Sequence, residues 1–95
     1  MPTPKLSDIE VQRELGNLDG WVRKDDSLVK TFTFLNFPAG ISFVDRVAVA
    51  AEKMDHHPDL DIRYTKISAT LSTHSAGGIT ANDVKLAKEM DRLAV

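Results

Sequence analysis

The spacing of apolar residues changes several times along the chain, and each change predicts a new secondary-structure element. Near the start, Ser7 and Glu10 have the spacing of a capping box, which predicts a short helix ending at residues 16–17. The apolar positions of this helix are Ile9, Val11 and Leu15.

Residues 20–34 have the alternation of an extended chain rather than of a helix. Leu28, Phe32 and Phe34 fall on one face at a spacing of two, and Asp25-Asp26-Ser27 has the composition of a turn. We therefore expect a β-hairpin here.

Helical periodicity returns between Pro38 and Asp55. The apolar stripe expected on this helix consists of Ile41, Val44, Ala48 and Ala51, reaches Asp55, and is widened by Val47 and Met54. Pro58 is expected to close the helix, because proline disfavours helical geometry in the residue before it. His56 and His57 would then lie in or just after the last turn.

A second hairpin is expected in residues 60–73, with its turn near residues 65–66. The apolar and polar faces of its second strand are Ile67, Ala69 and Leu71, and Ser68, Thr70 and Ser72, respectively. After a glycine-containing loop, Thr80 and Asp83 resemble a capping box. The helix that follows would pack through Val84, Leu86, Ala87, Met90 and Leu93.

The predicted order is therefore α-β-β-α-β-β-α. A four-stranded antiparallel sheet with three helices on one face gives an α+β fold, a two-layer sandwich. The 95 residues predict a single domain, 1–95, near the small end of what buries an adequate core alone. We therefore expect an oligomer, with its subunit contact on the open sheet face or at the sheet edges.

Charge and composition exclude several classes of protein. The chain has 12 Lys and Arg against 14 Asp and Glu, and its basic residues are scattered, which argues against nucleic-acid binding. Without cysteine, neither a disulfide framework nor a thiolate metal site is expected. No apolar run approaches the ~20 residues of a membrane span, and the first ten residues lack the apolar core of a signal peptide. We expect a cytoplasmic protein.

Histidines are the candidate catalytic groups, because His56, His57 and His74 all fall in loops or at element ends. The helix dipole and partial burial act on such imidazoles in opposite directions, which suits acid-base chemistry near neutral pH. Glu52, four residues before His56, can orient an imidazole or bind a polar ligand. Further polar candidates near the same two chain segments are Asp55, Ser72, Thr73 and Asp83.

Structural roles explain the same residues as well. A histidine pair stabilises a helix end, and Asp83 suits the third position of a capped helix. Metal binding is disfavoured because the H-E-x-x-H pattern is absent. A serine nucleophile, Ser72 or Ser75 beside His74, lacks its G-x-S-x-G motif. Acid-base catalysis without a metal or cofactor is the reading that remains.

Longer motifs point to a family. "AEKMDHHP" at 51–58, Tyr64, "LSTHSAGGIT" at 71–80 and Asp83 together resemble pterin-4a-carbinolamine dehydratase, known in animals as the dimerisation cofactor of a homeodomain transcription factor. The resemblance extends upstream to Gly20-Trp21 and covers most of the chain. Leu60 departs from it, since many relatives carry an aromatic residue there.

The resemblance implies an activity and a site. The enzyme would be a lyase that removes water from 4a-hydroxytetrahydrobiopterin and serves aromatic amino acid hydroxylases by tetrahydrobiopterin recycling. It would assemble as a homodimer or homotetramer. His56, His57 and His74 would be catalytic, and the substrate-binding positions would be Glu52, Asp55, Ser72, Thr73, Ser75 and Asp83. The alternative is a protein-interaction module, a transcriptional coactivator or dimer-stabilising cofactor with weak or no activity.

Overall fold

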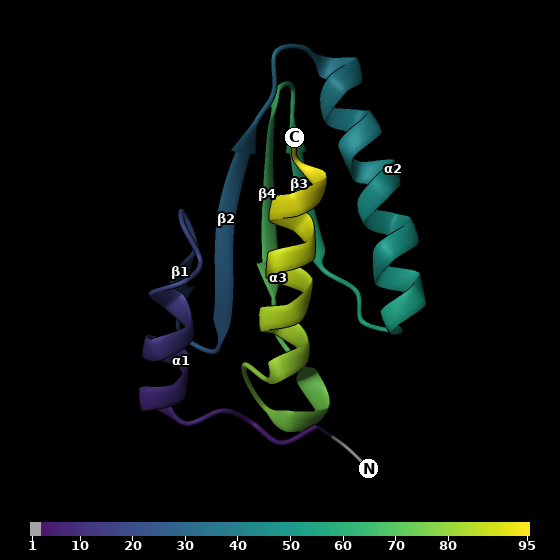
Figure 1. The fold of residues 1–95 in the computed structure, drawn as a ribbon. Coiled ribbons are helices and arrows are strands. Elements are labelled where there is room, and N and C mark those ends of the chain that lie inside the picture. The colour runs from purple at the N-terminus through teal and green to yellow at the C-terminus, as the bar shows by residue number, and fades with distance from the viewer. Residues whose placement is uncertain (1–2) are drawn as a thin grey trace.

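The helices and strands follow the predicted order α-β-β-α-β-β-α in the computed structural model, which describes residues 3–95 (Figure 1). They are α1 (Asp8–Leu15), β1 (Val22–Lys24), β2 (Ser27–Thr33), α2 (Phe37–Met54), β3 (Asp59–Arg63), β4 (Lys66–Leu71) and α3 (Ala81–Leu93), with a short 3₁₀ helix, η1 (His74–Ala76), before α3. The predicted α+β class is confirmed.

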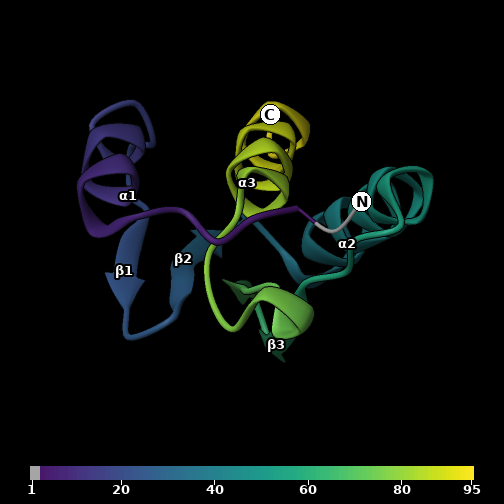
Figure 2. The same cartoon turned by 90° about the horizontal axis from the view of Figure 1, so that it is seen from below.

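The four strands form one antiparallel sheet in the order β1-β2-β4-β3. All three helices lie on the same side of it (Figure 2). Strand β3 therefore forms one edge of the sheet, and the face away from the helices is not covered within residues 3–95. The second turn lies at residues 64–65, one residue earlier than predicted, because Lys66 already pairs with Arg63.

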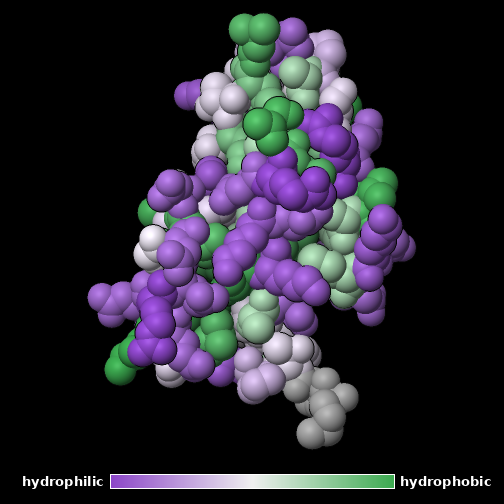
Figure 3. Space-filling view, in the orientation of Figure 1, coloured by the Kyte–Doolittle hydropathy of each residue, from purple (hydrophilic) through white to green (hydrophobic). Residues whose placement is uncertain are grey.

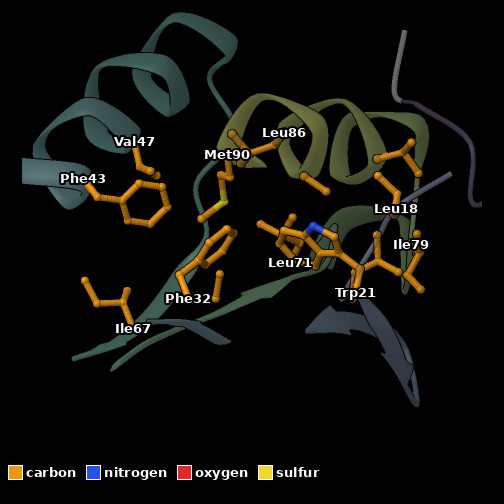
Figure 4. Close-up of a cluster of buried hydrophobic side chains, with 14 of the residues drawn as sticks. Leu18, Trp21, Phe32, Phe43, Val47, Ile67, Leu71, Ile79, Leu86 and Met90 are labelled. Atoms are coloured by element: carbon orange, nitrogen blue, oxygen red, sulfur yellow. The ribbon is translucent and has the colours of Figure 1, made fainter. Parts of the chain in front are cut away.

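The core lies between the helices and the sheet, where side chains from α2 and α3 meet those of β2 and β4 (Figure 4). At its centre the ring of Phe43 packs 4.8 Å from that of Phe32 and 5.0 Å from that of Phe34, measured between centroids. Gly40 allows α2 to approach the sheet, since a Cβ there would stand 3.1 Å from Ile67 Cδ1. Aromatic packing thus fixes how α2 rests on the sheet.

The buried face of α2 differs from the predicted stripe. It consists of Gly40, Phe43, Val47 and Ala51. Ala48 is exposed and Val44 only partly buried, because seating the large Phe43 ring turns these neighbours to the flank of the helix. Asp55 is exposed as well. A second apolar strip of α2 therefore lies outside the core.

The chain between α1 and β1 is anchored on α3 by Trp21. Its ring is buried against Phe32, and its indole N–H donates to the carboxylate of Asp91 at 3.0 Å. Lys30 Nζ donates to the same carboxylate at 2.8 Å. Trp21 therefore packs in the core, and Asp91, whose partners are 61 and 70 residues away, carried no sequence signal.

Both predicted capping boxes are present, at Ser7 with Glu10 and at Thr80 with Asp83. The apolar face expected for α1 is only partly correct, because Ile9 is exposed while Val11 is buried. No helix within residues 3–95 is both long enough and apolar enough to cross a membrane.

Candidate active site

A hollow of about 320 Å³ lies where the end of α2 approaches the end of β4 and η1. Its lining residues are Asp55, His56, His57, Ser72, Thr73, His74 and Ser75. The volume falls within the range of about 300 to 1,000 Å³ that small-molecule sites occupy. Folding thus brings the three histidines from two distant segments to one hollow.

The end of α2 determines where the first two histidines point. Asp55 adopts a left-handed conformation with φ of 51°. The amide of Asp55 then donates to the carbonyl of Glu52, and that of His56 to the carbonyl of Ala51, which is the hydrogen-bond pattern of a Schellman motif. Aspartate tolerates this conformation better than most residues do. The chain therefore leaves the helical path one residue before His56.

Asp83 contacts the His56 ring from outside the hollow. Its Nε2 lies 2.6 Å from Asp83 Oδ1, and its side chain is only 12% exposed while that of Asp83 is completely buried. Asp83 does not line the hollow, so its carboxylate reaches the site through the imidazole.

The other oxygen of Asp83 accepts two further hydrogen bonds. Thr73 Oγ1 and the backbone N–H of Thr80 each donate to Oδ2 at 2.8 Å. Both oxygens of this buried carboxylate are therefore hydrogen-bonded, as buried polar groups generally are. Asp83 therefore both caps α3 and orients His56; the sequence predicted the cap and a place near the site, but not the pairing with His56.

His57 pairs with Glu52, not with Asp83. The distance from its Nε2 to Glu52 Oε1 is 2.8 Å, and the two side chains are 57% and 79% exposed. From its position four residues before His56, we expected Glu52 to orient an imidazole or to bind a polar ligand. The imidazole that it contacts is that of His57, because the left-handed residue before His56 ends the helical spacing.

His74 is exposed on η1, inside a loop closed by paired backbone hydrogen bonds between Thr73 and Gly78. Gly77 supports this loop with φ of 75°, a conformation that favours glycine.

The hydroxyl of Ser72 donates to the carbonyl of Asp26, so Ser72 also links the site to the first hairpin. Within residues 3–95, no group of three His, Asp or Glu side chains is arranged to hold a metal ion.

A larger groove of about 880 Å³ lies along the flank of α2, toward β3. Its wall includes the outer apolar strip of α2, with Val44 and Ala48, and Leu60 of β3. In Figure 3, pale green apolar surface interrupts the hydrophilic surface over α2, whereas hydrophilic residues follow the outer face of α3. His57 lines both the groove and the histidine hollow, so the two are adjacent.

Residues 4–93 match the family described as Pterin 4 alpha carbinolamine dehydratase. A protein from Nocardia farcinica, provisionally named pterin-4-alpha-carbinolamine dehydratase, is 49% identical over 94 residues, covering 99% of each chain. A protein of the same provisional name from Roseiflexus sp. is 46% identical over 89 residues, covering 94% of this chain and 96% of its own.

Solved structures are similar as well. A protein from Brucella melitensis, described as a transcriptional coactivator/pterin dehydratase, superposes with a TM-score of 0.93 at 35% identity, covering 96% of this chain and 99% of its own. A pterin dehydratase-like protein identified as a RuBisCO assembly factor in the alpha-carboxysome gives 0.65 at 25% identity, covering 78% and 86%. The shared fold therefore carries more than one described role.

The two histidine-carboxylate pairs predict different effects on stability. Asp83→Ala leaves several buried donors without an acceptor and is expected to lower the free energy of unfolding by at least about 3 kcal/mol. Glu52→Ala breaks an exposed pair and should cost less than about 1 kcal/mol. Urea unfolding of both variants measures the difference; equal losses would contradict the structural role of the buried pair.

Proposed function

This chain belongs to the pterin-4a-carbinolamine dehydratase family, and from that premise we propose that it is a 4a-hydroxytetrahydropterin dehydratase. Residues 1–95 would act as a single catalytic domain. The observation that carries the proposal is the convergence of His56, His57 and His74 on one hollow. A carboxylate is hydrogen-bonded to each of the first two rings.

The proposed reaction needs two proton transfers. The bond between C4a and the hydroxyl oxygen breaks, the hydroxyl takes up one proton and leaves as water, and a ring nitrogen of the pterin gives up one proton. The product is quinonoid dihydropterin, with no net gain or loss of protons. Each positioned acid or base contributes about 10²- to 10⁴-fold, which is sufficient for a reaction that also proceeds unaided.

The remaining residues of the hollow would hold the heterocycle. We assign substrate contacts to Glu52 and to the lining residues Asp55, Ser72, Thr73 and Ser75. The exposed Glu52 carboxylate retains a second oxygen for donor groups on the pyrimidine ring. Because Asp83 is completely buried, we assign it the role of orienting His56 rather than a contact with substrate.

In the cell, the product would be reduced again for use by an aromatic amino acid hydroxylase. This places the protein in tetrahydrobiopterin recycling, in the cytoplasm, with a small pterin as its substrate. The acid-base chemistry needs neither a metal nor an organic cofactor, and the scattered charge fits no direct contact with nucleic acid.

Removing either accessible imidazole should reduce the rate. We expect His57→Ala and His74→Ala to lower kcat/KM at least tenfold without lowering the melting temperature. The carbinolamine is generated by a hydroxylase, and its loss of absorbance is followed with and without protein.

Gln12→Ala, an exposed change on α1, is the control and should retain full activity. Wild-type protein that gives no acceleration over buffer would overturn the proposed activity. Unchanged rates in both histidine variants would return those histidines to a structural role.

We further propose a homodimer, or a homotetramer built from it, formed along the β3 edge. A second copy related by a twofold axis at Ile62 would pair antiparallel with β3 and place Asp61 opposite Arg63 twice. Opposite charges directly across an antiparallel pair stabilise it. Ile62 is 42% and Tyr64 74% exposed, so the pairing would also cover apolar surface.

Charge at this edge should therefore prevent assembly. Ile62→Lys is expected to give a monomer, since lysine on an edge strand opposes pairing. Val22→Lys, at an exposed apolar position on the opposite edge strand, is the matched control. Light scattering should give two or four times the 10.5 kDa chain mass for wild type and control. A monomeric wild type, or dissociation only in the control, would contradict the proposal.

The rival function is a protein-interaction module, and the apolar groove on α2 favours it. Exposed apolar surface of this kind is found at many protein-interaction sites. Capture of a helical partner by a variant lacking all three histidines, together with wild-type protein inactive on the carbinolamine, would favour this reading.

A further inference from the structure

The hydrogen bonds behind His56 form a chain whose direction follows from the valence of each group. The hydroxyl of Thr73 donates its single proton to Asp83 Oδ2, which lies 2.8 Å away. The hydroxyls of Thr73 and Thr80 are 2.8 Å apart, and Thr73 has no second proton to donate. The Thr80 hydroxyl is therefore the donor in that contact.

The hydrogen-bond chain ends at a backbone amide in the first turn of α3. Thr80 is completely buried, and its Oγ1 accepts from the N–H of Asn82 at 3.2 Å while donating to Thr73. Every bond thus points the same way, from the first turn of α3 through Thr80 and Thr73 to Asp83. A capping box requires only the hydrogen bonds between Thr80 and Asp83, so the contacts with Thr73 and His56 go beyond capping.

The other end of the chain determines the tautomer of His56. The carboxylate of Asp83 is a hydrogen-bond acceptor at both oxygens, so Nε2 of His56 is the donor in its contact with Oδ1. A neutral His56 ring then carries its lone pair on Nδ1. Within residues 3–95, no buried side-chain nitrogen or oxygen lacks a hydrogen-bond partner, and Nδ1 makes no such bond. Nδ1 therefore reaches accessible surface, and His56 lines the hollow.

We propose that Thr80 is a positioning residue, which acts through Thr73 and Asp83 to hold His56 as the Nε2–H tautomer, so that His56 exchanges protons with substrate through Nδ1. The inference about Nδ1 as the reacting atom rests on the proposed dehydratase function. The tautomer itself is a property of the free protein and requires no substrate.

Ring ¹⁵N chemical shifts test the tautomer directly. At alkaline pH, where the ring is neutral, His56 should show a pyrrole-type Nε2 and a pyridine-type Nδ1. Asp83→Asn offers an amide N–H to Nε2 and should reverse the two signals, with a fall in kcat of at least tenfold and KM within about threefold of wild type. A wild-type ring protonated at Nδ1, or no reversal in Asp83→Asn, would overturn the proposal.

Substitution of Thr80, at the end of the hydrogen-bond chain farthest from His56, tests its positioning role. Thr80→Val removes the hydroxyl at similar size and should produce a mixture of tautomers with a kcat at least threefold lower. Thr80→Ser restores the hydroxyl and should restore both signals and rate. If Thr80→Val does not fold, Thr73→Val against Thr73→Ser makes the same comparison one bond nearer to Asp83.

The matched control is Ser7→Ala, which removes the other capping hydroxyl, at the start of α1. It should lower stability as the loss of a cap does, while leaving the His56 signals and kcat unchanged. A Thr80→Val protein with wild-type signals and wild-type kcat would show that Thr80 only caps the helix. The expected tautomers in a protein without dehydratase activity would support the hydrogen-bond chain and contradict the proposed function instead.

Discussion

The site depends on one buried carboxylate. Asp83 has no exposed side-chain surface, and a carboxyl group in such a position is tolerated only when its oxygens are hydrogen-bonded. Its partners come from the start of α3, from the chain just after β4 and from the chain just after α2. Satisfying Asp83 therefore fixes three separate segments against one another, and these segments surround the hollow that the histidines line.

The sequence predicts the elements well, because their signals are local. Alternation in the strands, helical periodicity and the two capping boxes each involve residues a few positions apart. Which carboxylate pairs with which histidine could not be predicted from the periodicity. Glu52 reaches His57 because Asp55 turns left-handed, and Asp83 reaches His56 across 27 residues. The hollow itself was predictable only as a convergence of two segments, because the same residues also suit helix ends and caps.

The orientation of α2 has a similar explanation and a consequence for function. Two neighbouring apolar stripes on this helix are compatible with its periodicity, and the fit of Phe43 between aromatic rings determines which one is buried. The other stripe lines the groove that ends at His57. A molecule bound in that groove would contact the exposed His57-Glu52 pair. The apolar groove therefore lies directly beside the proposed catalytic hollow.

The central claim is that the three histidines surround a bound pterin. A crystal structure of the protein with a non-reacting dihydropterin tests it most directly. The account predicts the bicyclic ring in the hollow, within hydrogen-bond distance of His56 Nδ1 and beside His57 and His74. A ring bound elsewhere, or one that leaves all three imidazoles facing solvent, would contradict it.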